Sequence, residues 1–156
     1  MKKLLLGLVF LFFALCNCCE AKSIKFVQIT DTMYGKNNAN EILDNAVKDI
    51  NEMKDIDFVV FTGDNTANAN VDYLQGFVKS AKKLNKPFYI VVGDRDVSKS
   101  KHLEKEVYAK KLHKLLGRKS PETLNYTFKK GKVVFIAVDG AKDFITMPNG
   151  YFNSTT

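Results

Sequence analysis

Aspartates follow the apolar runs of this 156-residue sequence at positions where several carboxylates could act together. They stand in the segments Asp31, Gly63-Asp64, Gly93-Asp94-Arg95-Asp96 and Asp139-Gly140. Carboxylates a few ångströms apart repel each other, so a cluster of them raises a pKa or requires a metal ion, an Arg or a Lys nearby. A single aspartate after a strand could instead cap a turn or the next helix. For Asp31, Asp64 and Asp94 together, we expect a shared anionic site.

Alternating strand and helix patterns must position these aspartates. Short β-rich apolar runs occupy residues 24–30, 58–62 and 88–92, and apolar residues recur at helical spacing over residues 42–53, 71–84 and 103–116. This order predicts an α/β fold, a βαβαβα unit with a parallel sheet and right-handed crossovers. The carboxyl ends of parallel strands share one edge, where ligands bind, so the aspartates should meet there. Residues 125–138 then form two strand-like runs around a Lys-Lys-Gly-Lys turn, which predicts a β-hairpin.

Composition and charge exclude several classes of protein. An apolar content of 46% excludes a disordered tail, and three Cys and two His argue against zinc-finger arrays and disulfide frameworks. The basic excess lies in residues 79–132, with 16 basic against 5 acidic side chains. Aromatic residues are not interleaved with these lysines as in single-strand nucleic-acid platforms. We therefore expect a solvated basic face and no nucleic-acid partner.

The N-terminus has the pattern of a secretory signal peptide. Lys2-Lys3 precedes an apolar run over residues 4–15, which has the length of a signal sequence and is too short to span a bilayer. Small residues three before and one before the cut predict cleavage after Ala21. Residues 1–21 would then be the signal, and residues 22–156 a secreted or periplasmic chain with no stable membrane insertion. The alternatives are an uncleaved membrane anchor and a lipid-modified cysteine.

Three motifs resemble those of the calcineurin-like metallophosphoesterase superfamily, in the same order and spacing. They are Asp31-Thr32-Met33, Gly63-Asp64-Asn65 and Gly93-Asp94-Arg95-Asp96. The family pattern is D-x-H, then G-D, then G-N-H with an acidic residue, and in the second half a lone His and G-H-x-H. The resemblance extends over residues 24 to about 152. It implies the first half of an α/β/β/α sandwich, phosphate-ester or other anionic ligands, and a two-metal centre of Mn, Fe or Zn that hydrolyses phosphate esters.

Residue by residue, the resemblance implies an altered site. Asp31 and Asp64 match metal ligands of the family. Asp94 stands in place of an Asn ligand and could still donate one oxygen to a metal. Met33 stands in place of a His ligand, and a thioether is a poor ligand in a mixed oxygen and nitrogen site. Arg95 replaces a catalytic His, and since it cannot lose a proton near neutral pH, we expect it to bind phosphate instead. We expect Asp96 to pair with Arg95, and we assign no catalytic residue.

The family's second-half histidine motifs do not occur in these 156 residues. His102 and His113 fall in the predicted third helix, where we expect solvated or capping roles. We therefore expect Mn, Fe or Zn to bind weakly or not at all, whereas Mg²⁺ or Ca²⁺ could bind through carboxylate oxygens. The sequence favours an exported, truncated metallophosphoesterase-family protein that is weakly active or inactive. The alternatives are an exported phosphate-ligand binding module and one half of a split enzyme.

Overall fold

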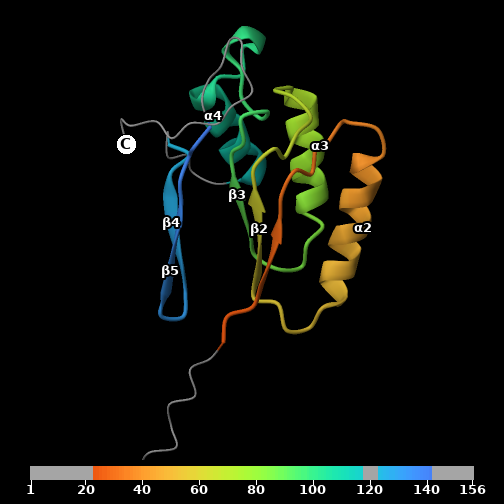
Figure 1. Ribbon diagram of the computed structural model, residues 1–156, viewed down its shortest axis with the longest axis vertical. Coiled ribbons are helices and arrows are strands. Elements are labelled where there is room, and N and C mark those ends of the chain that lie inside the picture. Colours follow the sequence, from red (N-terminus) through yellow and green to blue (C-terminus); the bar gives the residue numbers. More distant parts are fainter. Residues whose placement is uncertain (1–22, 118–122, 142–156) are drawn as a thin grey trace, which may run out of the picture.

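A three-stranded parallel sheet forms the centre of the fold in the computed structural model, which describes residues 23–117 and 123–141 (Figure 1). The strands are β1 (Phe26–Ile29), β2 (Phe58–Thr62) and β3 (Phe88–Val91), paired in the order β1-β2-β3. The helices are α2 (Ala39–Glu52), α3 (Val71–Ala81) and α4 (Lys105–Leu116), and strands β4 (Tyr126–Lys130) and β5 (Val133–Ala137) form an antiparallel hairpin. The predicted βαβαβα unit and hairpin are confirmed.

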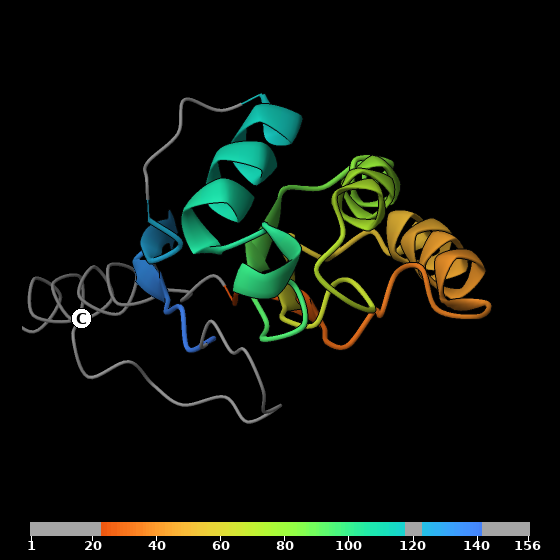
Figure 2. The same cartoon turned by 90° about the horizontal axis from the view of Figure 1, so that it is seen from above.

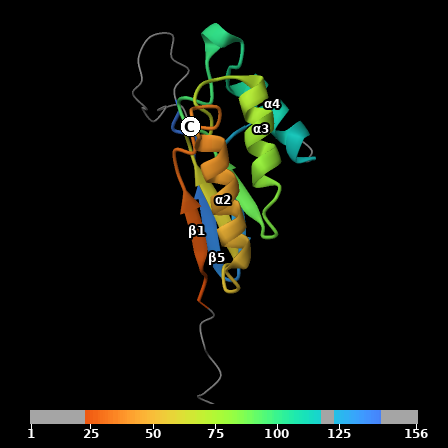
Figure 3. The same cartoon turned by 90° about the vertical axis from the view of Figure 1, so that its right-hand side faces the viewer.

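The helices lie on one face of the sheet and the hairpin lies on the other (Figure 2). Figure 3 views the molecule from the helix side, with α2 and α3 in front of the strands. These layers are consistent with part of the α/β/β/α sandwich that the family resemblance implies. The signal peptide predicted over residues 1–21 lies outside the described residues. No described helix has the length and apolar character needed to cross a membrane.

Side chains alternate between the two faces of each strand, so each face has its own core. On the helix side, Val59 and Phe61 of β2 are fully buried, and the Phe61 ring meets the ring of Phe77 from α3 at a centroid distance of 5.1 Å. On the hairpin side, fully buried Phe58 contacts four aromatic rings: Phe26, Tyr89, Phe128 and Phe135. These rings attach the hairpin to the sheet, and the Tyr126 hydroxyl donates to the Ile90 carbonyl at 2.8 Å.

The third helix begins later than the sequence predicts. The expected span was residues 103–116, but a short 3-10 turn, η1 (Lys99–Lys101), precedes it and α4 starts at Lys105. The prediction that His102 belongs to this helix is wrong, because His102 ends η1 in the left-handed conformation with a φ of 54°. His113 lies within α4 as predicted, and Gly117 ends that helix with a φ of 70°.

Candidate functional site at the carboxyl edge of the sheet

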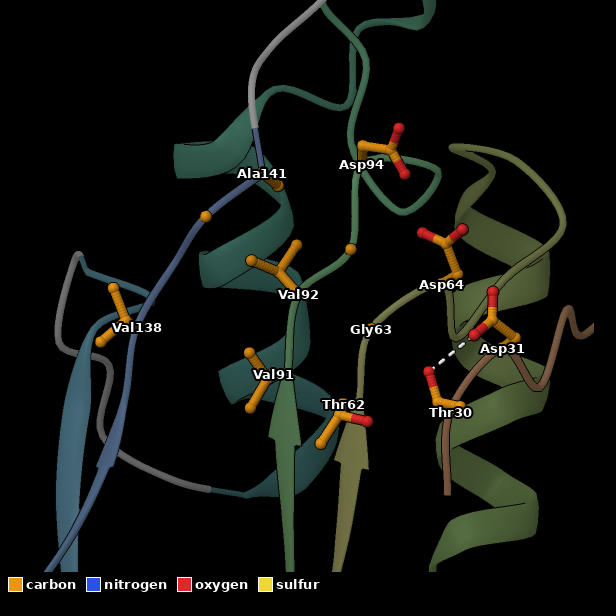
Figure 4. A pocket seen from close by; sticks show the side chains of 12 residues that line it. Thr30, Asp31, Thr62, Gly63, Asp64, Val91, Val92, Asp94, Val138 and Ala141 are labelled. Carbon is orange, nitrogen blue, oxygen red and sulfur yellow. Dashed lines mark hydrogen bonds between the residues drawn. The ribbon is translucent and has the colours of Figure 1, made fainter. Parts of the chain in front are cut away.

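A cavity of about 400 Å³ opens at the carboxyl ends of the three parallel strands. Asp31 from the end of β1, Asp64 from the end of β2 and Asp94 from the end of β3 all line it. Figure 4 shows the three carboxylates in a row above the strand ends. The segment after β5 closes one side through Val138, Gly140 and Ala141. The structure thus brings together the three aspartates that the sequence grouped.

The turns that present Asp31 and Asp64 have unusual backbone conformations. Asp31 has a φ of 54° and Asp64 a φ of 49°, values that residues with a Cβ rarely adopt. Backbone hydrogen bonds fix the two turns to each other, with Asp31 N donating to the Gly63 carbonyl and Met33 N to the Asp64 carbonyl at 3.1 and 3.0 Å. Strained turns of this kind persist only where their surroundings determine them, and they cluster at functional sites.

Arg95 contacts Asp64 with both its side chain and its backbone. Its Nε lies 3.3 Å from Asp64 Oδ2, and its backbone N–H donates to Asp64 Oδ1, also at 3.3 Å. Burial raises the pKa of Asp64 to about 6, with the neighbouring Asp94 carboxyl as the next cause, and the backbone N–H of Arg95 opposes the shift. The Arg95 side chain is 49% exposed, so water screens its charge. Arg95 is not among the residues that line the cavity itself.

The prediction that Asp96 pairs with Arg95 is wrong. Asp96 is fully buried and accepts five hydrogen bonds, from the backbone and side chains of Asn65 and Thr66 and from the backbone of Gly93, at 2.7 to 3.2 Å. Burial raises its pKa, and these donors oppose that rise. Asp96 therefore holds the turn after β2 against the turn after β3. Its role is to position the site.

Asp139 also turns away from the cavity. Its carboxylate lies 2.8 Å from Lys105 Nζ at the start of α4, and it accepts a hydrogen bond from the Ala141 backbone N–H at 3.0 Å. Both side chains of this ion pair are largely buried. Asp139 thus ties the end of the hairpin to α4, and among the described residues the carboxylate cluster of the cavity consists of Asp31, Asp64 and Asp94.

Met33 lies beside the cavity without lining it. It has a φ of 49° and lines a second, smaller cavity between the end of β1 and the start of α2. Two threonines that the sequence did not single out, Thr30 and Thr62, do line the carboxylate cavity. Thr30 Oγ1 donates to Asp31 Oδ2 at 2.6 Å (Figure 4). Their position as the last residues before the turns of β1 and β2 was the signal that could have identified them.

Comparison with known proteins agrees with this arrangement of strand-end aspartates. Residues 24–156 match the profile of the family described as calcineurin-like phosphoesterase. The chain belongs to this family. It is also 33% identical over 91 residues to a protein of Arcobacter nitrofigilis described as probable glycerophosphodiester phosphodiesterase GpdQ. That match covers 53% of this chain and 33% of the relative, so the chain spans about one third of the length of this curated relative.

Calcineurin-like phosphoesterases generally use divalent metals, and the residues of this cavity fit a two-metal centre poorly. Within residues 23–117 and 123–141, no three His, Cys, Asp or Glu side chains lie close enough together to hold a metal ion. Neither described histidine lines the cavity, Met33 faces the neighbouring one, and Arg95 contacts both oxygens of Asp64. The described donor set consists of carboxylate and hydroxyl oxygens. The assignment of Asp31, Asp64 and Asp94 as metal ligands stays a prediction, and so does the identity of the metal.

Proposed function

We propose that this chain is an exported calcineurin-like phosphoesterase-family protein that binds phosphate esters at the carboxyl edge of its sheet and hydrolyses them weakly or not at all. The observation that supports this most is the contact of Arg95 with Asp64 beside a cavity that no histidine of the described residues lines. Arg95 carries a permanent positive charge at the position where the family motif has a histidine. The signal-like N-terminal sequence supports export.

Arg95 has the chemistry of a phosphate-binding residue. A guanidinium group can donate two parallel hydrogen bonds to a phosphate, and 49% of the Arg95 side chain is exposed to solvent. It cannot protonate a leaving group near neutral pH, because it does not release its proton there. Binding can therefore persist in this site where acid catalysis has been lost. We assign Arg95 to substrate binding.

The carboxylates require a further positive charge before a phosphate can enter. Asp31, Asp64 and Asp94 together carry more negative charge than Arg95 balances, and like charges would repel the ligand. Oxygen donors without imidazole suit Mg²⁺ or Ca²⁺ better than Mn, Fe or Zn. Because no three His, Cys, Asp or Glu side chains of the described residues lie close enough to hold an ion by themselves, we propose that Mg²⁺ or Ca²⁺ enters together with the phosphate, and that Mn, Fe and Zn bind weakly or not at all.

The relative's description supports phosphodiesters as the substrate class. A phosphodiester has one negative charge, half that of a fully ionised phosphomonoester, so it meets less repulsion from three carboxylates. Dimethyl phosphate and inorganic phosphate are suitable probes of the two classes. We expect dimethyl phosphate to bind at least as tightly as inorganic phosphate at pH 7.5.

Calorimetric titration with Mg²⁺ present tests this function. Arg95→Gln should weaken the binding of dimethyl phosphate by about tenfold or more, because a charge-assisted hydrogen bond is lost. Lys101→Gln removes an exposed charge from η1 and is the matched control, which should stay within about twofold. Equal binding by the parent and Arg95→Gln would contradict the assignment. Rapid metal-dependent hydrolysis of bis(p-nitrophenyl) phosphate, lost in Asp64→Ala, would show instead that the chain is an efficient enzyme.

A further inference from the structure

A second cavity of about 210 Å³ lies directly beside the carboxylate cavity. It is lined by six apolar side chains: Ile29, Met33, Ala39, Ile42, Leu43 and Ala46. Thr30 and Asp31 line both cavities, so the turn after β1 separates them. Figure 4 shows these two residues at the margin of the carboxylate cavity. One side of this turn is therefore acidic, and the other is apolar.

The backbone of the turn fixes this division. Met33 has a φ of 49°, and its N–H donates to the Asp64 carbonyl at 3.0 Å. Tyr34 N, the next along the chain, donates to the Asn65 carbonyl, also at 3.0 Å. The thioether of Met33 is thus held on the apolar side by the turn that follows β2. The two cavities share a rigid wall, which suits a ligand with one charged and one apolar part.

The apolar cavity is open at a rim formed by α2. Of its lining residues, Leu43 is buried, whereas Ile42 is 58% exposed. An apolar cavity of about 150 Å³ is enough to hold a benzene ring, so this one can take a phenyl group or a short alkyl chain. The polar residues that line this cavity all lie in the shared turn. A polyol such as glycerol would therefore find few hydrogen-bond partners in it.

We propose that this cavity binds the apolar organic group of a phosphate ester whose phosphate lies in the adjacent carboxylate cavity. The proposal rests on the proposed function and adds specificity to it: aryl and short alkyl esters are preferred over esters of glycerol type. Burial of a phenyl group in an apolar cavity should strengthen binding by about tenfold relative to a methyl group.

Three probes of different organic groups test the preference on the full chain with Mg²⁺ present. They are methylphosphonate, phenylphosphonate and glycerol 3-phosphate, and the measurement is the dissociation constant by calorimetry. We expect phenylphosphonate to bind about tenfold more tightly than methylphosphonate, and glycerol 3-phosphate to bind no more tightly than methylphosphonate. Nuclear Overhauser contacts between the phenyl protons and the methyl groups of Met33 and Ile42 should locate the ring.

Two variants alter the cavity, and a third is their matched control. Ala46→Leu fills part of the cavity, and Ile42→Ser makes its exposed rim polar without disturbing the core. Each should reduce the phenyl preference to about twofold or less and leave methylphosphonate binding within about twofold of the parent. Asn45→Leu makes the same leucine substitution at the adjacent, exposed position of α2, outside the cavity, and should keep the full preference.

The outcomes separate this inference from the proposed function. If methylphosphonate and phenylphosphonate bind equally, the cavity inference is wrong while phosphate binding stands. If no probe binds, the proposed function fails as well. If the preference survives in both Ala46→Leu and Ile42→Ser, the organic group lies elsewhere. If Ala46→Leu changes the sedimentation coefficient of the chain, a second copy covers the cavity and the inference is overturned.

Discussion

Asp64 is an acid whose folded surroundings oppose its ionisation. Burial and the Asp94 carboxyl raise its pKa from the ordinary value of 3.8 to about 6. The screened guanidinium of Arg95 does not prevent this. A raised carboxyl pKa means that the folded chain holds its proton more tightly than the unfolded chain does. The folded state therefore gains stability as pH falls through 6, until the unfolded chain is protonated as well below about 4.

This linkage predicts a pH dependence that Asp64→Asn removes. Between pH 7 and pH 4.5, the free energy of unfolding of the parent should rise relative to that of Asp64→Asn by about 1 to 2 kcal/mol, after allowance for solvent screening. Urea denaturation at a series of pH values measures the difference. Asp49→Asn, at an exposed position of α2, is the control and should follow the parent. A difference that is flat or of opposite sign would refute a raised pKa for Asp64.

Asp96 is a positioning residue because it accepts hydrogen bonds from several donors in the interior. Its carboxylate accepts five hydrogen bonds from Asn65, Thr66 and Gly93 in the interior. Asp96→Ala leaves these donors buried and unpaired, so we expect a loss of about 3 to 5 kcal/mol in the free energy of unfolding. Asp96→Asn retains part of the acceptor capacity and should lose less. Thermal and urea denaturation measure both losses, and a neutral Asp96→Ala would contradict the assigned role.

At the scale of elements, the site depends on how closely the turn after β2 approaches the turn after β3. A Cβ on Gly93 would lie 2.0 Å from the backbone N of Asp64 and 2.9 Å from its Cα. Glycine is needed there because the neighbour is backbone, which cannot rotate aside as a flexible side chain can. The two loops therefore carry Asp64 and Asp94 as a single packed unit.

Gly93→Ala should accordingly damage both stability and the site. We expect a loss of about 3 kcal/mol or more in the free energy of unfolding, together with weaker binding of dimethyl phosphate, because Asp64 must move. Gly131→Ala is the control: its φ is 55°, but a Cβ there meets nothing within 4 Å. It should lose only about 1 to 2 kcal/mol, the cost of the left-handed conformation. Equal losses in the two variants would show that crowding at Gly93 is unimportant.

At the scale of the whole molecule, the cavity forms where the sheet and the hairpin layers meet. The aromatic cluster around Phe58 attaches the hairpin to the sheet, and the ion pair of Asp139 with Lys105 fixes its exit to α4. Val138 and Gly140, which follow the hairpin, line the same cavity as Asp31. The carboxylate cavity is therefore a product of all three layers.

Restoring the family motifs should not by itself create an efficient enzyme. In Met33→His with Asp94→Asn and Arg95→His, the new histidine at position 33 would occupy the side of the turn that lines the apolar cavity. The second-half histidine motifs would still be absent from the 156 residues. We expect hydrolysis of bis(p-nitrophenyl) phosphate with Mn²⁺ to stay near background, because partial sites lose most of the effect. Turnover well above background that Asp64→Ala abolishes would contradict this expectation.

The sequence by itself determined the elements and the edge at which the chemistry gathers. Helical and strand periodicities record which faces are buried, so they predicted the βαβαβα unit, the hairpin and the meeting of Asp31, Asp64 and Asp94 at the carboxyl edge. The start of α4 was placed two residues too early, because Leu103 fits the apolar stripe although it is buried from the loop before the helix. The local sequence pattern is the same whether a leucine is buried from a helix or from the loop that precedes it.

Only the tertiary structure decided where the neighbouring side chains point. Asp96 turns inward to the donors of Asn65 and Thr66, and Arg95 contacts Asp64. Met33 lines the apolar cavity from a turn in which its φ is positive and its N–H donates to the Asp64 carbonyl. The direction of a side chain after a strand depends on turn dihedrals and on the loops that pack against it, and both are set by segments about thirty residues away in the sequence.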